Sequence, residues 1–284
     1  MTRIGPYTLH VIETGRFALD GGAMFGVVPR TLWERRITPD ERNRIPMNMR
    51  CLLIESSGRL ILVDSGLGDK YDAKFAGIYA VNHERYDLHR SLRTAGFSAS
   101  DVTDVVLTHL HFDHCGGSTR RVGDRILPAF ENAEYYVQRS HWEWAKNPNV
   151  RERASFLEDN LAPLEASGRL RLLDGEGELW PGIEVFVVNG HTEGQQLVKI
   201  SGDGRTLVFV ADLLPTLAHL PIPWVMAYDV RPLVTFEEKK SFLERGAALG
   251  WHVMFEHDPV VEVATLKKGG SRVEAVEPRP LHEL

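Results

Sequence analysis

A cluster of metal-ligand side chains in the middle of the chain constrains its fold more than any other feature. Three histidines and one aspartate fall within six consecutive positions in H-x-H-x-D-H order, namely His109, His111, Asp113 and His114. The cluster directly follows the apolar run 105–107, which is typical of a buried strand. Imidazole and carboxylate groups are ligands that zinc and similar divalent ions prefer, and burying them without a partner is unfavourable. We therefore predict a metal site on a loop at a strand end.

Other segments also place histidine or aspartate side chains after apolar runs. The motif G-H-T-E-G contains His191, the run V-F-V-A-D ends in Asp212, and the segment F-E-H-D contains His257. Upstream, the run L-V-D-S-G contains Asp64. The order and spacing of these motifs resemble those of the metallo-β-lactamase superfamily, and the resemblance extends from about residue 7 to residue 265.

The resemblance implies an α/β fold, a four-layer αβ/βα sandwich with two metal ions at one edge. The implied ligands of the first ion are His109, His111 and His191. Those of the second ion are Asp113, His114 and His257, and Asp212 is implied to bridge both ions. Asp64 would support the site from behind the ligands. We expect two divalent metal ions. Zn²⁺ is the expected metal, and Mn²⁺, Fe²⁺ and Co²⁺ are the alternatives. A metal-bridging hydroxide would be the nucleophile, and Asp113 would be the catalytic residue that accepts or relays its proton.

Within the superfamily the chain looks closest to the N-acyl homoserine lactonases and the methyl-parathion-hydrolase-like enzymes, which share all seven ligands. The β-lactamases of the superfamily carry another residue in place of Asp212, and flavodiiron-type oxygen reductases need glutamate in place of His111. The resemblance thus implies a hydrolase that opens a lactone or ester. Pro215 is a departure, because lactonases of this branch often have tyrosine there. Alternatives are a mononuclear iron oxidoreductase of the persulfide-dioxygenase kind, a glyoxalase II-like thioesterase, a phosphotriesterase and a catalytically silent ligand sensor.

The segment 213–231 directly follows Asp212 and combines prolines, which limit its conformations, with large apolar residues. Together with the glycine-rich segment 21–33, we expect it to form the walls of the substrate pocket. The expected substrate contacts are Tyr228, His219, Trp224 and Phe25. Tyr228 or His219 would donate the oxyanion hydrogen bond that a tyrosine at position 215 would otherwise have given. The other histidines lack ligand spacing and are expected at the surface or in packing: His10, His83, His89, His141, His252 and His282.

Charge and composition narrow the choice of partners. The net charge is −6, and the basic residues are scattered among acidic ones, which argues against nucleic acid as a partner. No apolar stretch approaches the roughly 18 residues that a membrane span needs, and a disulfide between the two cysteines, Cys51 and Cys115, is not expected. We expect a cytoplasmic protein with a small-molecule substrate, no membrane partner and the capacity to form a homodimer.

Hydrophobic periodicity and turn residues predict strands with helices interspersed. Strands are expected at 7–13, 50–55, 60–64, 104–108, 134–138, 183–188, 197–200, 207–210 and finally 252–256. Helices are expected at 87–96, 141–146, 153–166 and 236–249, and a long ordered loop at 19–46. This pattern favours a single metallo-β-lactamase-like domain over residues 1–284.

Overall fold

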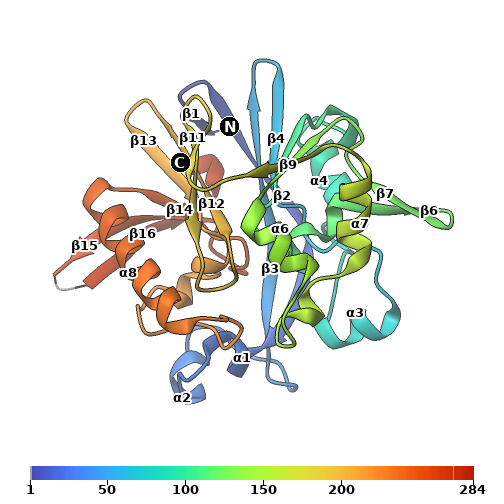
Figure 1. The fold of residues 1–284 in the computed structure, drawn as a ribbon. Coiled ribbons are helices and arrows are strands. Elements are labelled where there is room, and N and C mark those ends of the chain that lie inside the picture. The colour runs from blue at the N-terminus through green and yellow to red at the C-terminus, as the bar shows by residue number, and fades with distance from the viewer. Residues whose placement is uncertain (1, 271) are drawn as a thin grey trace.

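Two mixed β-sheets dominate the computed structural model, which describes residues 2–270 and 272–284. Figure 1 shows the sheets side by side, with helices on the outside. The strands of the first sheet are, in order across it, β1 (Thr2–Ile4), β2 (Tyr7–Asp20), β3 (Arg44–Ser56), β4 (Arg59–Val63), β5 (Asp104–Val106), β8 (Glu134–Gln138) and β9 (Leu170–Leu173). Those of the second are β10 (Gly177–Trp180), β11 (Ile183–Val188), β12 (Gln195–Gly202), β13 (Arg205–Phe209), β14 (His252–Met254), β15 (Val263–Gly269) and β16 (Arg272–Arg279).

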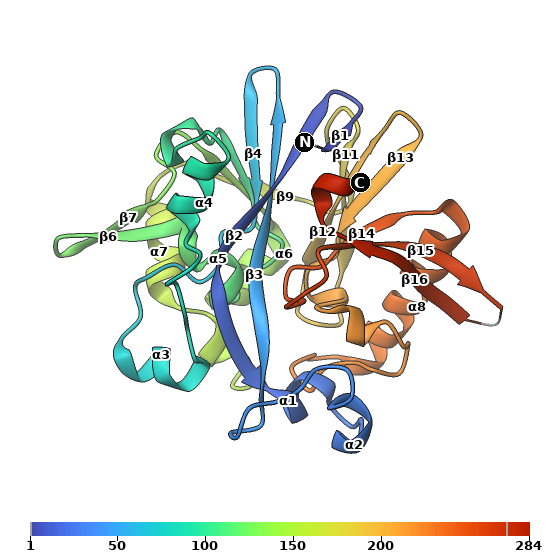
Figure 2. The same ribbon diagram turned by 180° about the vertical axis from the view of Figure 1, so that it is seen from behind.

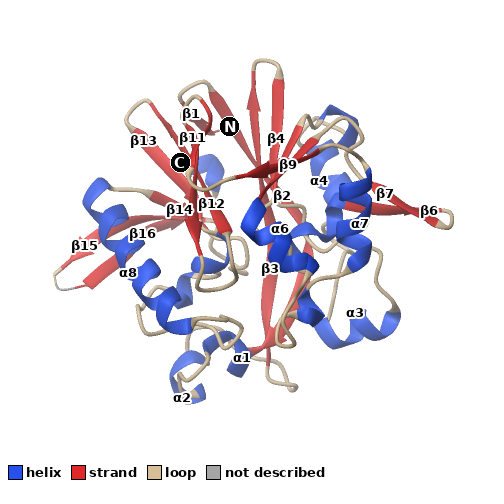
Figure 3. Cartoon of the chain, in the orientation of Figure 1, coloured by secondary structure: helices blue, strands red, loops and turns tan. Residues whose placement is uncertain are grey.

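Helices cover the outer face of each sheet (Figures 2 and 3). The helices α4 (Leu88–Thr94), α6 (Arg139–Lys146) and α7 (Glu158–Ala166) share a hydrophobic core with the first sheet. The helix α8 (Pro232–Leu249) packs on the second sheet. The α/β sandwich predicted from the sequence is therefore confirmed.

Strand β3 shows why the sheets are buried on both faces. Leu52 and Ile54 pack in the core that joins the two sheets, whereas Cys51 and Leu53 pack under the helices of the first sheet. Successive side chains of a strand point to opposite faces, so a strand between two layers is apolar at every position. This accounts for the unbroken apolar run in the sequence.

The parallel strands direct the site to one edge of the sandwich. Strands β4, β5, β8 and β9 run parallel in the first sheet, and β13 runs parallel to β14 in the second. The carboxyl ends of parallel strands meet at one edge of a sheet, which is where sites in such sheets form. The H-x-H-x-D-H cluster follows β5, Asp212 follows β13 and His257 follows β14.

The elements that the sequence did not predict are short or partly exposed. The expected loop 19–46 is partly wrong, because β2 continues to Asp20, β3 begins at Arg44, and α1 (Gly21–Phe25) and α2 (Arg30–Trp33) lie between them. Helices of four or five residues have too few turns to show a hydrophobic period. The expectation that the strand at 252–256 is the last is also wrong, since β15 and β16 follow it. The hairpin of β6 (Thr119–Val122) and β7 (Arg125–Pro128) was missed as well.

Cys51 and Cys115 are both buried, and neither forms a disulfide. Among residues 2–270 and 272–284, no helix combines the length and apolar character needed to cross a lipid bilayer.

Candidate metal centre

Four side chains from three segments form the first donor set. The Nδ1 atom of His111 lies 3.0 Å from Nε2 of His109 and 3.2 Å from Nε2 of His191. The Oδ2 atom of Asp212 lies 3.1 Å from the same His191 nitrogen. All four residues are buried. The structure thus brings the three histidines of the predicted first ion together with the predicted bridging carboxylate.

The second donor set lies on the other side of Asp212. The Nε2 atoms of His114 and His257 are 3.1 Å apart, and Oδ2 of Asp113 lies 3.8 Å from each of them. The Oδ1 atom of Asp212 is 3.2 Å from Nε2 of His257, and its Oδ2 is 3.6 Å from Nε2 of His114. Asp212 is therefore shared between the two sets, as the sequence predicted for a bridging ligand.

Hydrogen bonding on the far side of the rings fixes which nitrogens face the centre. Nδ1 of His257 lies 2.8 Å from the carbonyl oxygen of Asn48, and Nδ1 of His114 lies 3.2 Å and 3.0 Å from carboxylate oxygens of Asp64 and Glu256. A carbonyl or ionised carboxylate oxygen only accepts, so each Nδ1 carries a proton and each Nε2 is the nitrogen that faces the centre. Two such nitrogens 3.1 Å apart repel unless a proton or a metal ion lies between them.

These separations fit divalent cations of the zinc type. In a tetrahedral zinc site with ligands at 2.0–2.1 Å, donor atoms lie about 3.3 Å from one another. The distances of 3.0–3.2 Å among the histidine nitrogens are close to this value. In addition, the Oδ1 atom of Asp212 is buried without a hydrogen-bond partner among the described residues. The donor atoms can hold two ions, and their role as ligands stays a prediction.

The donors differ in how strongly they hold a proton. Burial, together with the neighbouring His114 and His111, holds the pKa of His109 well below its ordinary value. Burial opposes ionisation of Asp212, but the charges of His191 and the other histidines outweigh it and hold the pKa of Asp212 well below its usual range. At His114, His191 and His257 the nearby carboxylates, Asp212 among them, outweigh burial and raise the pKa of the imidazole, to about 9 for His257. The same negative charge attracts a metal ion, which replaces the proton on binding.

Residues behind the ligands hold them in place. Asp229 accepts a 2.9 Å hydrogen bond from Nδ1 of His191. Asp64 accepts from the backbone N–H and the hydroxyl of Thr108, at 2.7 Å and 2.6 Å, next to His109. Such outer partners fix the orientation of a metal ligand and commonly change metal affinity or activity 10- to 100-fold when removed. Asp64 lies where the sequence predicted, whereas the sequence analysis placed Asp229 in the pocket wall and did not identify its role.

Glu152 was also missed. Its carboxylate accepts 2.7 Å hydrogen bonds from Thr192 and Trp144 and lies 3.5 Å from Nε2 of His111. Burial opposes its ionisation, but the nearby His111 and the hydrogen bond from Thr192 outweigh it and lower the pKa of Glu152 to about 2. In the sequence Glu152 stands between two arginines and looks like part of a solvated surface, so no local signal marks it.

Two glycines let the ligand loop approach the loop after β4. A Cβ atom on Gly116 would lie 2.1 Å from the carbonyl oxygen of Leu67, and one on Gly117 would lie 2.1 Å from that of Ser65. Any other residue would therefore push these loops apart. The glycines after the H-x-H-x-D-H cluster keep the helix α5 (Phe112–Cys115), which carries Asp113 and His114, against the first sheet.

A cavity of about 350 Å³ opens onto both donor sets. The ligands that line it are His111, Asp113, His191, Asp212 and His257, and its other lining residues are Leu19, Met24, Met47, Tyr79, Phe112, Arg151, Glu152, Ala154, Ser155, Met226, Ala227 and Tyr228. Small-molecule sites are typically cavities of this size, with apolar walls and a few polar groups. The segments 213–231 and 21–33 each contribute lining residues, as expected. Most of the other lining residues, however, come from parts of the chain outside these two segments.

Of the four expected substrate contacts, only Tyr228 lines this cavity. The rings of Phe25 and His219 stack with centroids 4.5 Å apart, and Trp224 packs edge-on against Phe25. Nε2 of His219 donates to the carbonyl oxygen of Met24 at 2.8 Å, and burial lowers the pKa of His219 to about 3. These three side chains are turned into the core behind the wall, so direct substrate contact by them is not supported.

Among the histidines expected at the surface or in packing, His141 is buried and connects two ligand loops. Its Nε2 atom accepts a 2.7 Å hydrogen bond from the backbone N–H of Leu110, and its Nδ1 donates to the carbonyl oxygen of Glu193. Burial lowers the pKa of His141 to about 3, so the ring stays neutral and can accept. His141 is thus a packing residue that positions the first donor set.

Comparison with known proteins identifies the family. Residues 49–248 match the model of the metallo-beta-lactamase superfamily, and the chain belongs to this superfamily. The chain is therefore a metallo-hydrolase by family.

Individual relatives agree with this placement. A solved structure of a probable metal-dependent hydrolase from Staphylococcus aureus is 30% identical, with a TM-score of 0.90 over 98% of this chain and 99% of that chain. An N-acyl homoserine lactonase of Bacillus cereus is 25% identical over 211 residues, which are 71% of this chain and 73% of the relative. AidC, described as a dizinc quorum-quenching lactonase, shares the fold at 23% identity and a TM-score of 0.79, over 98% of this chain and 96% of AidC. The similarity to lactonases predicted from the motifs is confirmed.

Proposed function

We propose that the chain is a dinuclear metal-dependent hydrolase that opens lactones or esters, with N-acyl homoserine lactones as the substrate class. One observation carries this proposal: Asp212 lies between two complete donor sets at the base of a cavity with apolar walls. The similarity to a lactonase of Bacillus cereus supports the choice of substrate class. We propose Zn²⁺ as the metal.

His109, His111 and His191, with Asp113, His114 and His257 and the shared Asp212, would hold two divalent ions, which would supply the activation of water and the polarisation of the carbonyl. The chain supplies the geometry. Five of the seven donor residues face the cavity, so a carbonyl group can approach both sets from one side. The apolar walls exclude bulk water around it and strengthen the electrostatic interactions inside.

Asp113 is the residue that moves the proton in this proposal. Its side chain is buried, faces the cavity and lies beside His114 and His257. A carboxylate at this position can accept a proton from the attacking water and return it to the ring oxygen as the lactone C–O bond breaks. The product then leaves as a hydroxy acid.

In this proposal two phenols donate hydrogen bonds to the carbonyl oxygen of the substrate. Tyr79 and Tyr228 both line the cavity, from α3 (Ala73–Tyr79) and from the segment 213–231. Burial raises the pKa of both hydroxyl groups, with a further contribution from the charge of Asp113. They therefore stay protonated at neutral pH and can donate a hydrogen bond to the developing negative charge.

A hydrolysis screen tests the proposal. Protein reconstituted with Zn²⁺ is assayed on N-hexanoyl homoserine lactone, p-nitrophenyl acetate, S-lactoylglutathione and paraoxon, with the same protein carrying Asp113→Asn as control. We expect the lactone to have the highest kcat/KM, on the order of 10⁴ M⁻¹s⁻¹ or more. A faster reaction on the thioester or the phosphotriester, or a lactone rate equal to that of the control, would contradict it.

The same preparation separates this proposal from an iron oxidoreductase. A mononuclear iron enzyme does not need Asp113, His114 and His257 as a second donor set, and their convergence favours the hydrolase. Oxygen consumption with a persulfide substrate on the iron-loaded protein, without lactone hydrolysis on the zinc-loaded protein, would reverse this choice.

A further inference from the structure

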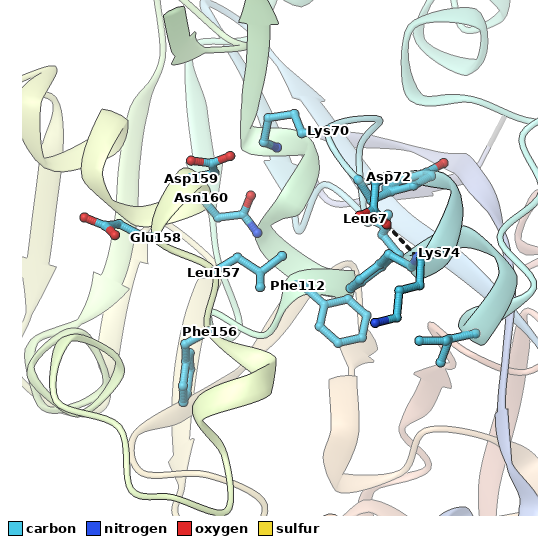
Figure 4. Close-up of a pocket in the computed structure, with 13 residues that line it drawn as sticks. Leu67, Lys70, Asp72, Lys74, Phe112, Phe156, Leu157, Glu158, Asp159 and Asn160 are labelled. Carbon is cyan, nitrogen blue, oxygen red and sulfur yellow. Dashed lines mark hydrogen bonds between the residues drawn. The ribbon is translucent and has the colours of Figure 1, made fainter.

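A second cavity, of about 600 Å³, adjoins the metal cavity. It lies between the stretch 67–78, which includes most of α3, and the stretch 156–160 at the start of α7 (Figure 4). Phe112 lines both cavities, and the ring of Phe156 packs against the ring of His111 with centroids 5.0 Å apart. The second cavity therefore begins beside the metal centre, and we call it the side cavity.

The end of the side cavity next to the metals is apolar. Phe112 and Phe75 meet edge to face with centroids 5.1 Å apart, and Leu157 and Phe156 line the opposite side. Figure 4 shows Phe112 and Phe156 at one end of this space. A substrate group that passes from the metals into the side cavity must cross this apolar surface, which favours a hydrocarbon arm.

The other end of the side cavity is polar. Lys70 donates to the carbonyl oxygens of Gly116 and Thr119, and the Thr119 hydroxyl donates at 3.0 Å to the carbonyl oxygen of Asp159. These bonds place Lys70 next to the start of α7, and Figure 4 shows it at the same end as Asp159 and Asn160. An ammonium group has three protons, so one remains for a group in the cavity.

Asn160 is a buried polar residue directed into the same space. Only 2% of its surface is exposed, and its backbone N–H donates to the carbonyl oxygen of Leu157. Its side-chain amide lines the side cavity, points into it (Figure 4) and forms no hydrogen bond with the rest of the described chain. The amide therefore has donor and acceptor groups free to face the cavity, and a ligand group that enters it can bond them in place of water.

The charges of the side cavity define that group. Three carboxylates, Asp72, Glu158 and Asp159, and two ammonium groups, Lys70 and Lys74, line it. An anionic ligand group would meet more negative than positive charge, and a cationic one would meet Lys70 itself. A neutral oxygen that accepts hydrogen bonds from Lys70 and Asn160 fits without a charge penalty.

We propose that the side cavity binds the far end of the substrate, and that Lys70 and Asn160 recognise a neutral hydroxyl or keto oxygen on an apolar arm. The substrate class is then a lactone or ester whose long acyl arm carries such an oxygen away from the reacting carbonyl. This inference rests on the proposed function, because the arm enters the side cavity only when the reacting carbonyl lies at the metals.

A pair of matched substrates tests it. N-octanoyl homoserine lactone and its 8-hydroxy derivative differ only in one hydroxyl group. We expect the zinc-loaded wild-type protein to prefer the hydroxylated lactone about three- to tenfold in kcat/KM, as one neutral hydrogen bond gives. The variant Asn160→Leu, which keeps the branched shape of the side chain without its polar atoms, should lose or invert this preference. The control Asn132→Leu, at an exposed site where the amide donates to Ser100, should keep it.

Direct binding separates a failure of this inference from a failure of the proposed function. The non-hydrolysable probes 8-hydroxyoctanamide and octanamide are titrated into the zinc-loaded wild-type protein and the two variants. Tighter binding of the hydroxylated amide by wild type and by Asn132→Leu, but not by Asn160→Leu, supports the inference even if neither lactone is hydrolysed. Equal binding of the two amides by wild type, or a preference that Asn160→Leu retains, would overturn it.

Discussion

The base and the walls of the metal cavity are built in opposite ways. At the base, every donor lies in a loop or short helix that follows a strand, and the histidine rings donate hydrogen bonds to buried carboxylates such as Asp229 and Asp64, which hold the rings. The walls come from α3, α1, the stretch 151–155 and the segment 213–231, and more than half of their lining side chains are apolar. The contrast indicates that the base determines the chemistry and the walls determine which substrate is used.

The largest effect should follow from changing Asp113 at the base. The substitution Asp113→Asn keeps the shape and one side-chain oxygen but removes the negative charge and the proton acceptor. We expect kcat for lactone hydrolysis to fall about 10³-fold or more, since general acid–base catalysis alone accounts for 10²–10⁴-fold, while the melting temperature in the presence of Zn²⁺ changes little. A kcat within a few-fold of wild type would remove Asp113 from the mechanism.

Changing a partner behind the ligands should have a smaller effect. In the variant Asp229→Asn, Nδ1 of His191 still has an oxygen to donate to, but without its negative charge. We expect a 10- to 100-fold loss in affinity for the first ion or in kcat/KM, measured by competition with a chelator. The substitution Asp174→Asn, at an exposed carboxylate paired with Arg139, is the control and should match wild type.

Changing the walls should alter the substrate rather than the chemistry. We expect Tyr79→Phe and Tyr228→Phe each to lower kcat/KM for lactones without changing metal content. In contrast, His219→Ala should leave kcat/KM per folded molecule nearly unchanged and lower the free energy of unfolding by about 1–3 kcal/mol, because it leaves the buried Met24 carbonyl without its donor. Loss of activity in His219→Ala with full stability would show that this residue contacts the substrate after all.

His219 should also contribute a pH dependence of stability. Its pKa is about 3 in the fold and about 6.5 in an unfolded chain. Between these values the unfolded state binds the additional proton, so the stabilisation is complete above pH 6.5 and is lost as the pH falls towards 3. The difference in unfolding free energy between wild type and His219→Gln should therefore change by about 1.4 kcal/mol per pH unit from pH 6 to pH 4. Denaturant titrations that give a constant difference would contradict the buried, neutral state.

The same contrast explains what the sequence could predict. The ligands stand in short contiguous motifs after apolar strands, so their residue types and order were enough to predict the base. Asp229 meets His191 across 38 positions, and Glu152 meets Thr192 across 40, and no local pattern marks such pairs. In the walls, the apolar residues of the segment 213–231 could face the cavity or the core with equal hydrophobic gain, and only tertiary packing placed His219 and Trp224 inside.

The central claim, two complete donor sets that share Asp212, is tested most directly by counting metal ions. Protein reconstituted with Zn²⁺ and freed of excess metal is analysed by inductively coupled plasma mass spectrometry, for wild type and for His257→Ala. We predict about two ions per chain in wild type and about one in His257→Ala, because removing one nitrogen from the second set should empty it and leave the first set bound. One ion per chain in wild type, with no change in His257→Ala, would contradict the account.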